Sequence, residues 1–171
     1  MTKLVSRRGF LRQATQCADA DALRPPGAHA DLFLDLCRDC NLCVQSCPED
    51  VVTLDKSGRP LLDPTKGACT FCNACTDVCP TGALDAGRVV EWPWRAQVSD
   101  ACLSDNGVFC RSCQDGCDTS AIRFRLQVGG RATALINDTQ CTGCGGCLSI
   151  CPVGAIQLRK GRPNNNEETV A

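Results

Sequence analysis

The spacing of the cysteines limits what this chain can fold into more than any other feature of its sequence. Cysteine supplies 17 of the 171 residues, and all but one of these fall into four quartets. The quartets are Cys37, Cys40, Cys43 and Cys47; Cys69, Cys72, Cys75 and Cys79; Cys102, Cys110, Cys113 and Cys117; and Cys141, Cys144, Cys147 and Cys151. Aromatic residues make up only 4% of the chain, which leaves little material for a large core. A small domain with a thin core needs disulfides or bound metal, so the cysteines must supply one of these.

The second half of the sequence repeats the first. Cys40, Cys43 and Cys47 recur 70 positions later in the third quartet, and the whole second quartet recurs 72 positions later as the fourth. Between the quartets of each half, two apolar segments flank a polar turn, at 51–54 and 61–62 and again at 122–128 and 132–136. This pattern predicts a hairpin in each half, and the residues after each third cysteine suit a short helix. We therefore predict an α+β fold of two tandem units, each with short helices over a small antiparallel sheet.

These patterns divide the chain into five segments. They are an N-terminal extension (1–30), a first unit (31–85), a linker (86–101), a second unit (102–159) and a flexible tail (160–171). The linker contains both tryptophans of the chain, in Trp92-Pro93-Trp94. We expect these rings to pack one half against the other, because large aromatic side chains are usually buried; an aromatic patch for a partner is the alternative.

The N-terminal extension contains Ser6-Arg7-Arg8-Gly9-Phe10-Leu11-Arg12, which is similar to a twin-arginine export signal. Such a signal requires an apolar region next, whereas residues 13–26 are rich in polar residues and proline. We therefore expect no export and a cytoplasmic protein; a short amphipathic helix is the plainer reading. Arg7 and Arg8 are candidates for binding a partner, with a solvated charge pair as the alternative.

Charge and hydropathy exclude two further classes of protein. The net charge is −1, which gives no sign of the basic surface that nucleic acids require. No apolar run approaches the length of about 18 residues that a membrane-spanning helix needs.

The spacing C-x₂-C-x₂-C-x₃-C-P, present in the first, second and fourth quartets, is typical of [4Fe–4S] clusters. Three closely spaced thiolates offer ligands from one loop, and the proline turns the chain away after the fourth. Zinc sites use paired C-x-x-C knuckles, for which the third and fourth cysteines are surplus. A disulfide scaffold is disfavoured in a reducing compartment. We predict four clusters, three from the regular quartets and one from the irregular third.

In two-cluster ferredoxins the fourth cysteine of a motif binds the other cluster. By this rule the four ligand sets are Cys37, Cys40, Cys43 with Cys79; Cys69, Cys72, Cys75 with Cys47; Cys141, Cys144, Cys147 with Cys117; and Cys102, Cys110, Cys113 with Cys151. The alternative is contiguous ligation, in which each quartet binds its own cluster.

The third quartet departs from the regular spacing, because seven residues separate Cys102 from Cys110 and Gly107 occupies the regular position. We prefer a looped-out insertion with Cys102 still a ligand; a three-thiolate site with a labile or three-iron cluster is the alternative. Cys17 has no partner at motif spacing and is expected to be a free thiol. His29 is the only histidine and receives no role, which weakens acid–base or triad chemistry. We therefore predict no enzyme activity.

Residues 31–159 resemble two bacterial-type, two-cluster ferredoxin-like units in tandem. The length, the Ser-Arg-Arg-Gly-Phe-Leu-Arg start, the three regular motifs and the irregular third quartet together resemble the NapF family of ferredoxin-type proteins. This resemblance implies a cytoplasmic accessory protein that helps NapA, the molybdenum-containing catalytic subunit of periplasmic nitrate reductase, to acquire or reduce its cluster before export. The alternative is a ferredoxin-type electron carrier between redox partners, and a purely structural role for the clusters is the third possibility.

Overall fold

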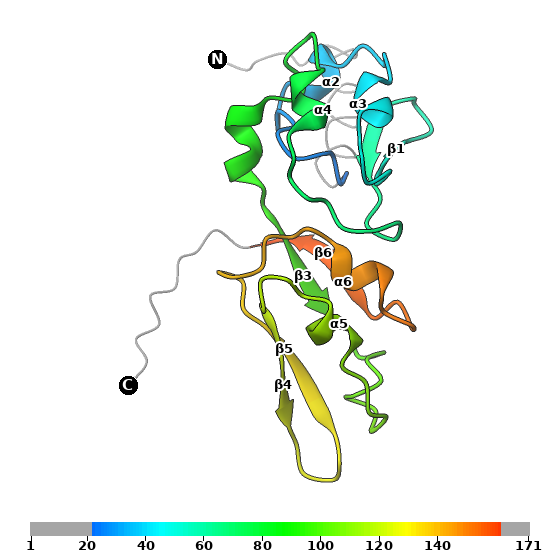
Figure 1. The fold of residues 1–171 in the computed structure, drawn as a ribbon, viewed down its shortest axis with the longest axis vertical. Helices are drawn as coiled ribbons and strands as arrows, with labels where there is room; N and C mark the ends of the chain where they lie inside the picture. Colours follow the sequence, from blue (N-terminus) through cyan, green and yellow to red (C-terminus); the bar gives the residue numbers. More distant parts are fainter. Residues whose placement is uncertain (1–21, 162–171) are drawn as a thin grey trace, which may run out of the picture.

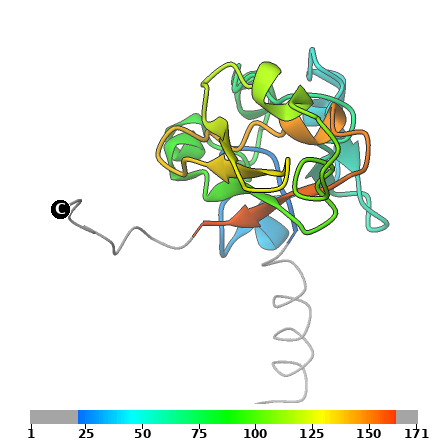
Figure 2. The ribbon, with the colours of Figure 1, turned by 90° about the horizontal axis from the view of Figure 1, so that it is seen from below.

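The computed structural model describes residues 22–161 (Figure 1). Arg7, Arg8 and Cys17 lie outside the described residues, as does most of the tail that the sequence predicts. Two units follow one another along the longest axis of the molecule, with the first unit at the top of Figure 1 and the second below it. Seen along that axis, the two units overlap (Figure 2). No helix within 22–161 is long and apolar enough to cross a membrane.

The first unit contains three one-turn helices, α2 (Phe33–Leu36), α3 (Leu42–Gln45) and α4 (Ala74–Asp77), and the strands β1 (Val52–Leu54) and β2 (Pro60–Leu62). The strands form an antiparallel hairpin in which Val52 lies opposite Leu62. Asp55 organises the turn, because its Oδ1 accepts hydrogen bonds from the backbone N–H groups of Ser57 and Arg59 at 2.7 and 3.0 Å. The hairpin predicted at 51–54 and 61–62 is thus confirmed.

The second unit repeats this plan with α5 (Ser112–Asp115), β4 (Ile122–Leu126), β5 (Ala132–Ile136), α6 (Gly146–Ser149) and β6 (Ile156–Lys160). The hairpin of β4 and β5 runs from the pair Ile122–Ile136 to the pair Leu126–Ala132. It is longer than the hairpin of the first unit, whose register ends after three pairs. Gly129 and Gly130 both have positive φ and make the turn that the sequence predicts there. The small antiparallel sheets and short helices confirm the α+β class.

The segment 86–101, assigned to a linker by the sequence, contains the 3₁₀ helix η1 (Ala86–Glu91) and the strand β3 (Trp94–Val98). β3 pairs antiparallel with β6, so it belongs to the sheet structure of the second unit. The first unit has only an isolated bridge, Ala28 to Leu84, at the equivalent place. Ala28 and Leu84 precede Val98 and Ile156 by 70 and 72 positions, the same offsets as the cysteines. The duplication therefore begins before the first quartet of each unit.

Two small cores hold the units. In the first, Phe33, Ala83 and Leu84 pack around Cys43. In the second, which is larger, the buried residues are Trp94, Ala96, Cys113, Ile122, Cys147, Ile156 and Leu158. Cysteines are members of both cores, so the packing of each unit depends on what its thiols bind.

The two tryptophans have different places in the fold, and Trp92 packs where the two units meet. Trp92 donates a hydrogen bond from its indole N–H to the carbonyl of Gly143 at 3.2 Å, and its ring meets that of Phe71 edge-on at 6.1 Å. Phe71 belongs to the first unit and Gly143 to the second. Trp94 lies in the core of the second unit. The predicted packing of one half against the other is thus confirmed for Trp92, whereas Trp94 is buried within the second unit.

Candidate metal centres

Each regular cysteine motif folds into the same tight loop. The residues on either side of its second cysteine have positive φ: Asp39 and Asn41, Phe71 and Asn73, Gly143 and Gly145. Asn, Asp and Gly adopt this left-handed conformation at low cost, whereas Phe71 is an outlier. The irregular third motif lacks the feature, and Arg111, which follows its second cysteine, has φ −134°. Regular spacing therefore corresponds to a regular backbone, and the insertion after Cys102 changes both.

Four pockets in the described part of the chain are each lined by four cysteines. Site A is lined by Cys37, Cys40, Cys43 and Cys79; site B by Cys47, Cys69, Cys72 and Cys75; site C by Cys117, Cys141, Cys144 and Cys147; and site D by Cys102, Cys110, Cys113 and Cys151. Every site combines three cysteines of one quartet with one cysteine of the other quartet in the same unit. This grouping has the crossed pattern that the sequence predicts.

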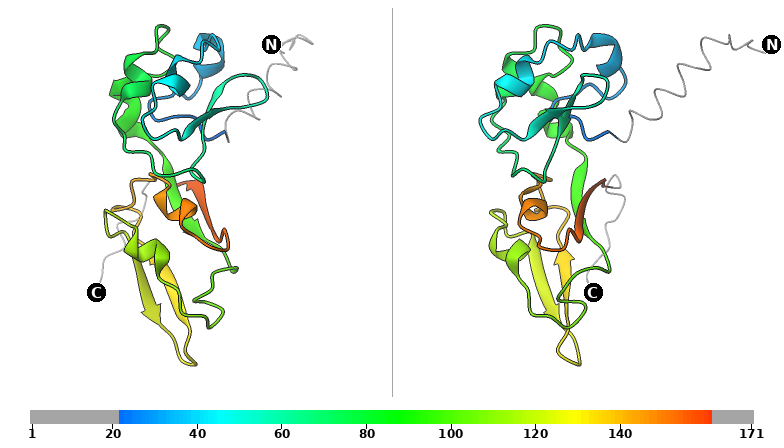
Figure 3. Two further views of the ribbon diagram at one scale, coloured as in Figure 1. Left: turned by 45° about the vertical axis from the view of Figure 1, so that its right-hand side comes forward. Right: turned by 90° about the vertical axis from the view of Figure 1, so that its right-hand side faces the viewer.

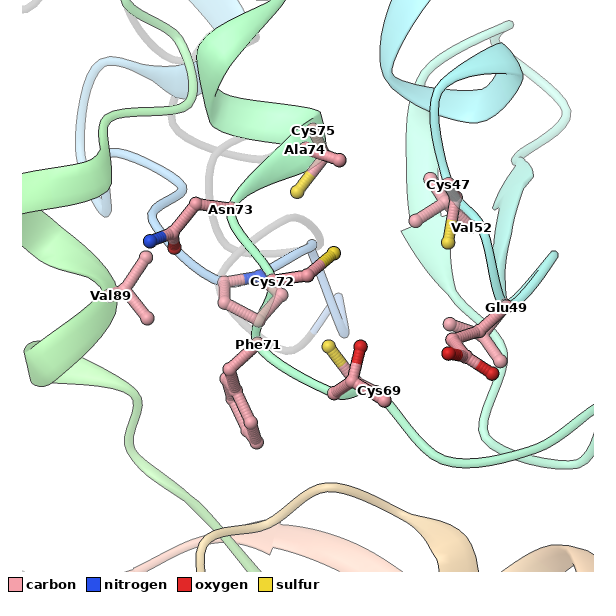
Figure 4. Close-up of a pocket in the computed structure, with 13 residues that line it drawn as sticks. Cys47, Glu49, Val52, Cys69, Phe71, Cys72, Asn73, Ala74, Cys75 and Val89 are labelled. Atoms are coloured by element: carbon pink, nitrogen blue, oxygen red, sulfur yellow. The ribbon is translucent and has the colours of Figure 1, made fainter.

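Site B shows how the fold produces this grouping (Figure 4). The loop before α4 and the start of that helix carry Cys69, Cys72 and Cys75, and the segment before β1 carries Cys47 on the opposite side. The four sulfur atoms point toward a common space between these two segments. The crossing follows because α3 and α4, which begin within the two quartets of the unit, pack against each other.

The donor set of each site fits an iron–sulfur cluster. In each site the four cysteines lie around one shared space that is partly open to solvent. Four thiolates around one zinc ion at about 2.3 Å would leave no such space. Within residues 22–161, no three His, Cys, Asp or Glu side chains are grouped as one metal ion requires. Soft thiolates surrounding a larger space suit a cluster of several irons.

The third cysteine of each quartet is the most difficult to ionise. Burial, with smaller contributions from neighbouring thiolates, raises the pKa of Cys43 and Cys113 to about 11 and that of Cys75 and Cys147 to about 12. Thiols with such pKa values stay protonated at neutral pH unless a cation replaces the proton. Metal binding at these positions therefore releases protons and is coupled to packing of the two cores.

Backbone and hydroxyl donors surround the fourth cysteines of the quartets. Cys79 Sγ accepts from the N–H of Leu84 at 3.5 Å, and Cys151 Sγ accepts from the N–H of Ala155 at 3.3 Å. Burial works to raise the pKa of Cys79 and Cys117, but hydrogen bonds from backbone N–H groups and from a threonine hydroxyl outweigh it and lower both pKa values. The lowered pKa makes Cys79 and Cys117 easier to ionise than an ordinary thiol.

The four sites form a row in the order A, B, C, D. Beyond the larger effect of burial, Cys43 of site A raises the pKa of Cys75 in site B, and Cys113 of site D raises that of Cys147 in site C. Sites B and C meet across the two units, because the N–H of Cys69 donates to the carbonyl of Cys144 at 2.8 Å. The row therefore runs through the whole described molecule without a gap between the units.

Cys102 is buried and lines site D, although it lies outside the regular spacing. The residues that follow it close a loop of their own, in which the N–H of Val108 donates to the carbonyl of Leu103 at 2.9 Å. The side-chain amide of Asn106 donates to the carbonyls of Asp100 and Cys102, both at 2.8 Å. The geometry is that of a looped-out insertion, which leaves Cys102 beside the other three cysteines of the site.

Comparison with known proteins agrees with these sites. Two matches to the 4Fe-4S dicluster domain cover residues 36–84 and 108–155. A ferredoxin-type protein NapF of Escherichia coli is 34% identical over 88% of this chain and 92% of its own length. NapF of Haemophilus influenzae is 35% identical over 92% of this chain and 96% of its own length. The chain belongs to the NapF family of ferredoxin-type proteins. It is also 38% identical, over 83% of its length, to the methylamine utilization ferredoxin-type protein MauM of Methylorubrum extorquens, of which the match covers 73%.

Sequence reasoning missed one difference between the sites of this NapF-family chain. In site C, the backbone N–H of Ala96 in β3 donates to Cys141 Sγ at 3.5 Å. The equivalent residue in site B, 70 positions earlier, is Pro26, which lines the site beside Cys69 and has no N–H to donate. The 70-residue offset, applied outside the quartets, would have revealed this pair.

The remaining predictions fall outside the sites. His29 is half-buried, and its Nδ1 accepts a hydrogen bond from the N–H of Leu32 at 3.3 Å, which is a local structural role. Arg7, Arg8 and Cys17 lie beyond the described residues, so their predicted roles stay predictions.

Proposed function

We propose that this chain is an iron–sulfur accessory protein that holds four [4Fe–4S] clusters and serves the cytoplasmic precursor of the nitrate reductase catalytic subunit NapA. Its thiolates would hold one cluster at each of the sites A, B, C and D, with crossed ligation and with Cys102 as a ligand at site D. The observation that carries the proposal is the gathering of all sixteen quartet cysteines into four pockets of four.

The clusters, when bound, would accept and donate single electrons. The chain's own residues hold them in a row and set their surroundings. The third cysteines of the quartets, of which Cys43, Cys113 and Cys147 are buried and Cys75 is half-buried, line the inner side of the sites. The N–H groups of Leu84, Ala96 and Ala155 stabilise negative charge on the sulfurs they contact. Asp39 lines site A and Glu49 lines site B beside the cysteines, and we propose no enzymatic reaction for either carboxylate.

The accessory role is supported by the NapF relatives, which match this chain over nearly their whole length. A protein that assists the precursor before its export acts in the cytoplasm. There it would help the precursor to acquire or reduce its own cluster before export.

A second candidate function is a ferredoxin-type electron carrier between redox partners. The row of sites favours it, because adjoining sites let an electron that enters at one end leave at the other. The match to MauM, from a different metabolic system, is compatible with a carrier that serves more than one kind of partner.

The first test of the proposal is the metal content of protein purified without oxygen. Four clusters give about 16 irons per chain and a brown colour. A colourless protein that contains zinc, or that is folded without metal, would refute the cluster assignment.

The second test separates the two functions in cells that lack this protein. An accessory role predicts that the nitrate reductase catalytic subunit accumulates with a deficient cluster. A catalytic subunit that is fully loaded but is not reduced would instead support the electron carrier. The matched control is the same strain carrying the wild-type chain on a plasmid.

A further inference from the structure

The hairpin of β4 and β5 projects from the end of the molecule that lies farthest from the first unit (Figures 1 and 3). Its outer part is open to solvent, with Leu126 75% and Val128 100% exposed. Single exposed apolar side chains are common on protein surfaces. Two of them together at one tip are less common and indicate a surface that contacts something other than water. The hairpin of the first unit is shorter and has polar residues, Lys56 and Ser57, at its turn.

Three exposed arginines flank these apolar side chains. Arg123 and Arg125 project from β4, and Arg131 follows the turn. No Asp or Glu occurs between Ala121 and Asn137, and no described carboxylate forms an ion pair with any of the three. The hairpin is therefore a concentrated positive charge with no internal neutralisation.

The second unit as a whole is also more positively charged than the first. Residues 22–85 carry five Arg or Lys and nine Asp or Glu, whereas residues 86–161 carry eight and six. In the first unit, Asp55 at the hairpin turn is paired with Arg24 at 2.9 Å, which neutralises it. Of the two hairpins in residues 22–161, that of the second unit therefore carries the larger uncompensated positive charge.

The hairpin is also tied to site D, the last site of the row. Phe124 of β4 lines this site together with Cys102 and Cys110. The N–H of Ala132 in β5 donates to the carbonyl of Ser104, in the insertion after Cys102, at 3.0 Å. A molecule bound to the hairpin would therefore lie next to an end of the row and not beside its middle.

We propose that the hairpin of β4 and β5 is the docking surface for a protein partner with an acidic face. Carboxylates of the partner pair with Arg123, Arg125 and Arg131, and Leu126 and Val128 supply the apolar centre of the contact. An anionic membrane fits less well, because membrane binding grows with buried apolar area and the tip offers only two such side chains. The idea that electrons leave from site D to a partner bound at the hairpin rests on the proposed function. The proposal that the hairpin is a docking surface does not depend on it.

The test compares two charge reversals of equal size in the complete, cluster-loaded chain. Arg123→Glu/Arg125→Glu changes the hairpin, and Lys56→Glu/Lys66→Glu changes exposed lysines of the first unit. The probe is purified precursor of the nitrate reductase catalytic subunit, immobilised for binding at physiological salt. We expect the hairpin variant to bind at least about tenfold more weakly and with less salt dependence, and the first-unit variant to bind within about twofold of wild type. Unchanged iron content and visible absorption establish that both variants are folded.

Three results would overturn the proposal. Equal losses of binding in both variants would indicate an effect of net charge alone, and an unchanged affinity of the hairpin variant would show that the hairpin does not bind the precursor. If the hairpin variant loses binding only to phosphatidylserine vesicles, measured in parallel, the hairpin binds a membrane. If wild-type protein does not bind the precursor, the partner named under the proposed function is wrong, and a second measurement tests the hairpin by itself. A photocrosslinking residue at Val128 in living cells should then trap one protein with an acidic surface, and Arg123→Glu/Arg125→Glu should abolish the product. The same residue at Ser57, on the turn of the first hairpin, should not trap it; equal trapping at both positions would refute the docking surface.

Discussion

The two units share a cysteine framework but differ in the strand pair that closes each of them. In the second unit, β3 and β6 form a ladder from the pair Trp94–Lys160 to the pair Val98–Ile156. In the first unit the same place holds one bridge, from Ala28 to Leu84. Pro25 and Pro26 have no N–H and Gly27 has φ +85°, so this stretch cannot continue a strand. The duplication therefore preserved the cysteine sites, whereas the paired segments that close the two units, here called their frames, became different.

Residues at equivalent positions of the two frames make different contacts. Trp94 fills the core of the second unit, whereas Arg24, 70 positions earlier, forms an ion pair with Asp55 and donates to the carbonyl of Pro60 at 2.9 Å. Ala96 donates its N–H to a cysteine, whereas Pro26 cannot. Two sites with the same number of thiolates are in this way given different surroundings, which is how one protein can hold chemically distinct clusters.

The largest expected effect is a loss of iron that tests whether the cysteine ligands are crossed between the two quartets of a unit. If Cys37 and Cys79 share site A, Cys37→Ala/Cys79→Ala removes one cluster and leaves about 12 irons per chain. Cys69→Ala/Cys79→Ala then takes one thiolate from each of two sites and leaves about 8 irons, or about 14 if a three-iron cluster persists at both. Contiguous ligation predicts the opposite, because Cys69 and Cys79 would then share a cluster. Iron analysis of anaerobic protein decides between the two patterns.

The same experiment in the second unit shows whether both units obey one rule. Cys117→Ala/Cys141→Ala should leave about 12 irons, and Cys141→Ala/Cys151→Ala about 8, or about 14 if a three-iron cluster persists at both sites. If one unit follows the crossed pattern and the other does not, the two units are not equivalent in how they bind their clusters.

The next effect compares the irregular site D with the regular site A. Replacing Cys102 with Ala should leave about 15 irons if a three-iron cluster persists, or about 12 if the cluster is lost. Cys37→Ala, at the corresponding position of the first unit, is the matched control. An iron content of about 16 after the Cys102 change would remove this residue from the ligand set.

Much of each site could be predicted from the sequence, because motif spacing is local. The spacing of Cys69, Cys72 and Cys75 determines one loop, and the glycine pair at 129–130 determines one turn. The pairing of β3 with β6 joins residues some sixty positions apart, and nothing local in either strand identifies the other. The contact of Cys69 with Cys144 depends on how the two units pack, so the order of the sites could not be predicted.

A smaller effect concerns the stability of the first frame. Arg24 is buried, so Arg24→Ala leaves Asp55 without its ion pair and should lower the free energy of unfolding by about 2 kcal/mol. Burial works to raise the pKa of Asp55, but N–H donors from Arg59 and Ser57 and the guanidinium of Arg24 outweigh it and lower that pKa. The pair therefore stabilises the fold above about pH 4, the value of the unfolded carboxyl, and its contribution is lost as the pH falls through the lower folded value.

Urea unfolding of wild type and of Arg24→Ala at pH 7 measures this difference. Arg38→Ala, which removes an exposed arginine of the same unit, is the control for loss of charge. If the two variants unfold at the same urea concentration, the ion pair does not hold the hairpin of the first unit in place.

The smallest expected effect concerns the reduction potentials of sites B and C. Hydrogen bonds to cluster sulfurs stabilise the reduced, more negative state and raise the potential. Pro26→Ala supplies to site B an N–H at the position where Ala96 donates in site C, so it should raise the potential of site B and bring it closer to that of site C. A bond stronger by about 1 kcal/mol in the reduced state corresponds to roughly 40 mV for one electron.

A redox titration followed by electron paramagnetic resonance resolves a shift of this size, and the converse change gives its control. Ala96→Pro removes the donor from site C, where the N–H points to Cys141, and should lower the potential there by a similar amount. A structural disturbance alone would broaden or reduce the signals of both variants without opposite shifts. Opposite shifts would mean that one backbone N–H makes the two central sites unequal, whereas unchanged potentials would leave the difference between the two frames without a role in electron transfer.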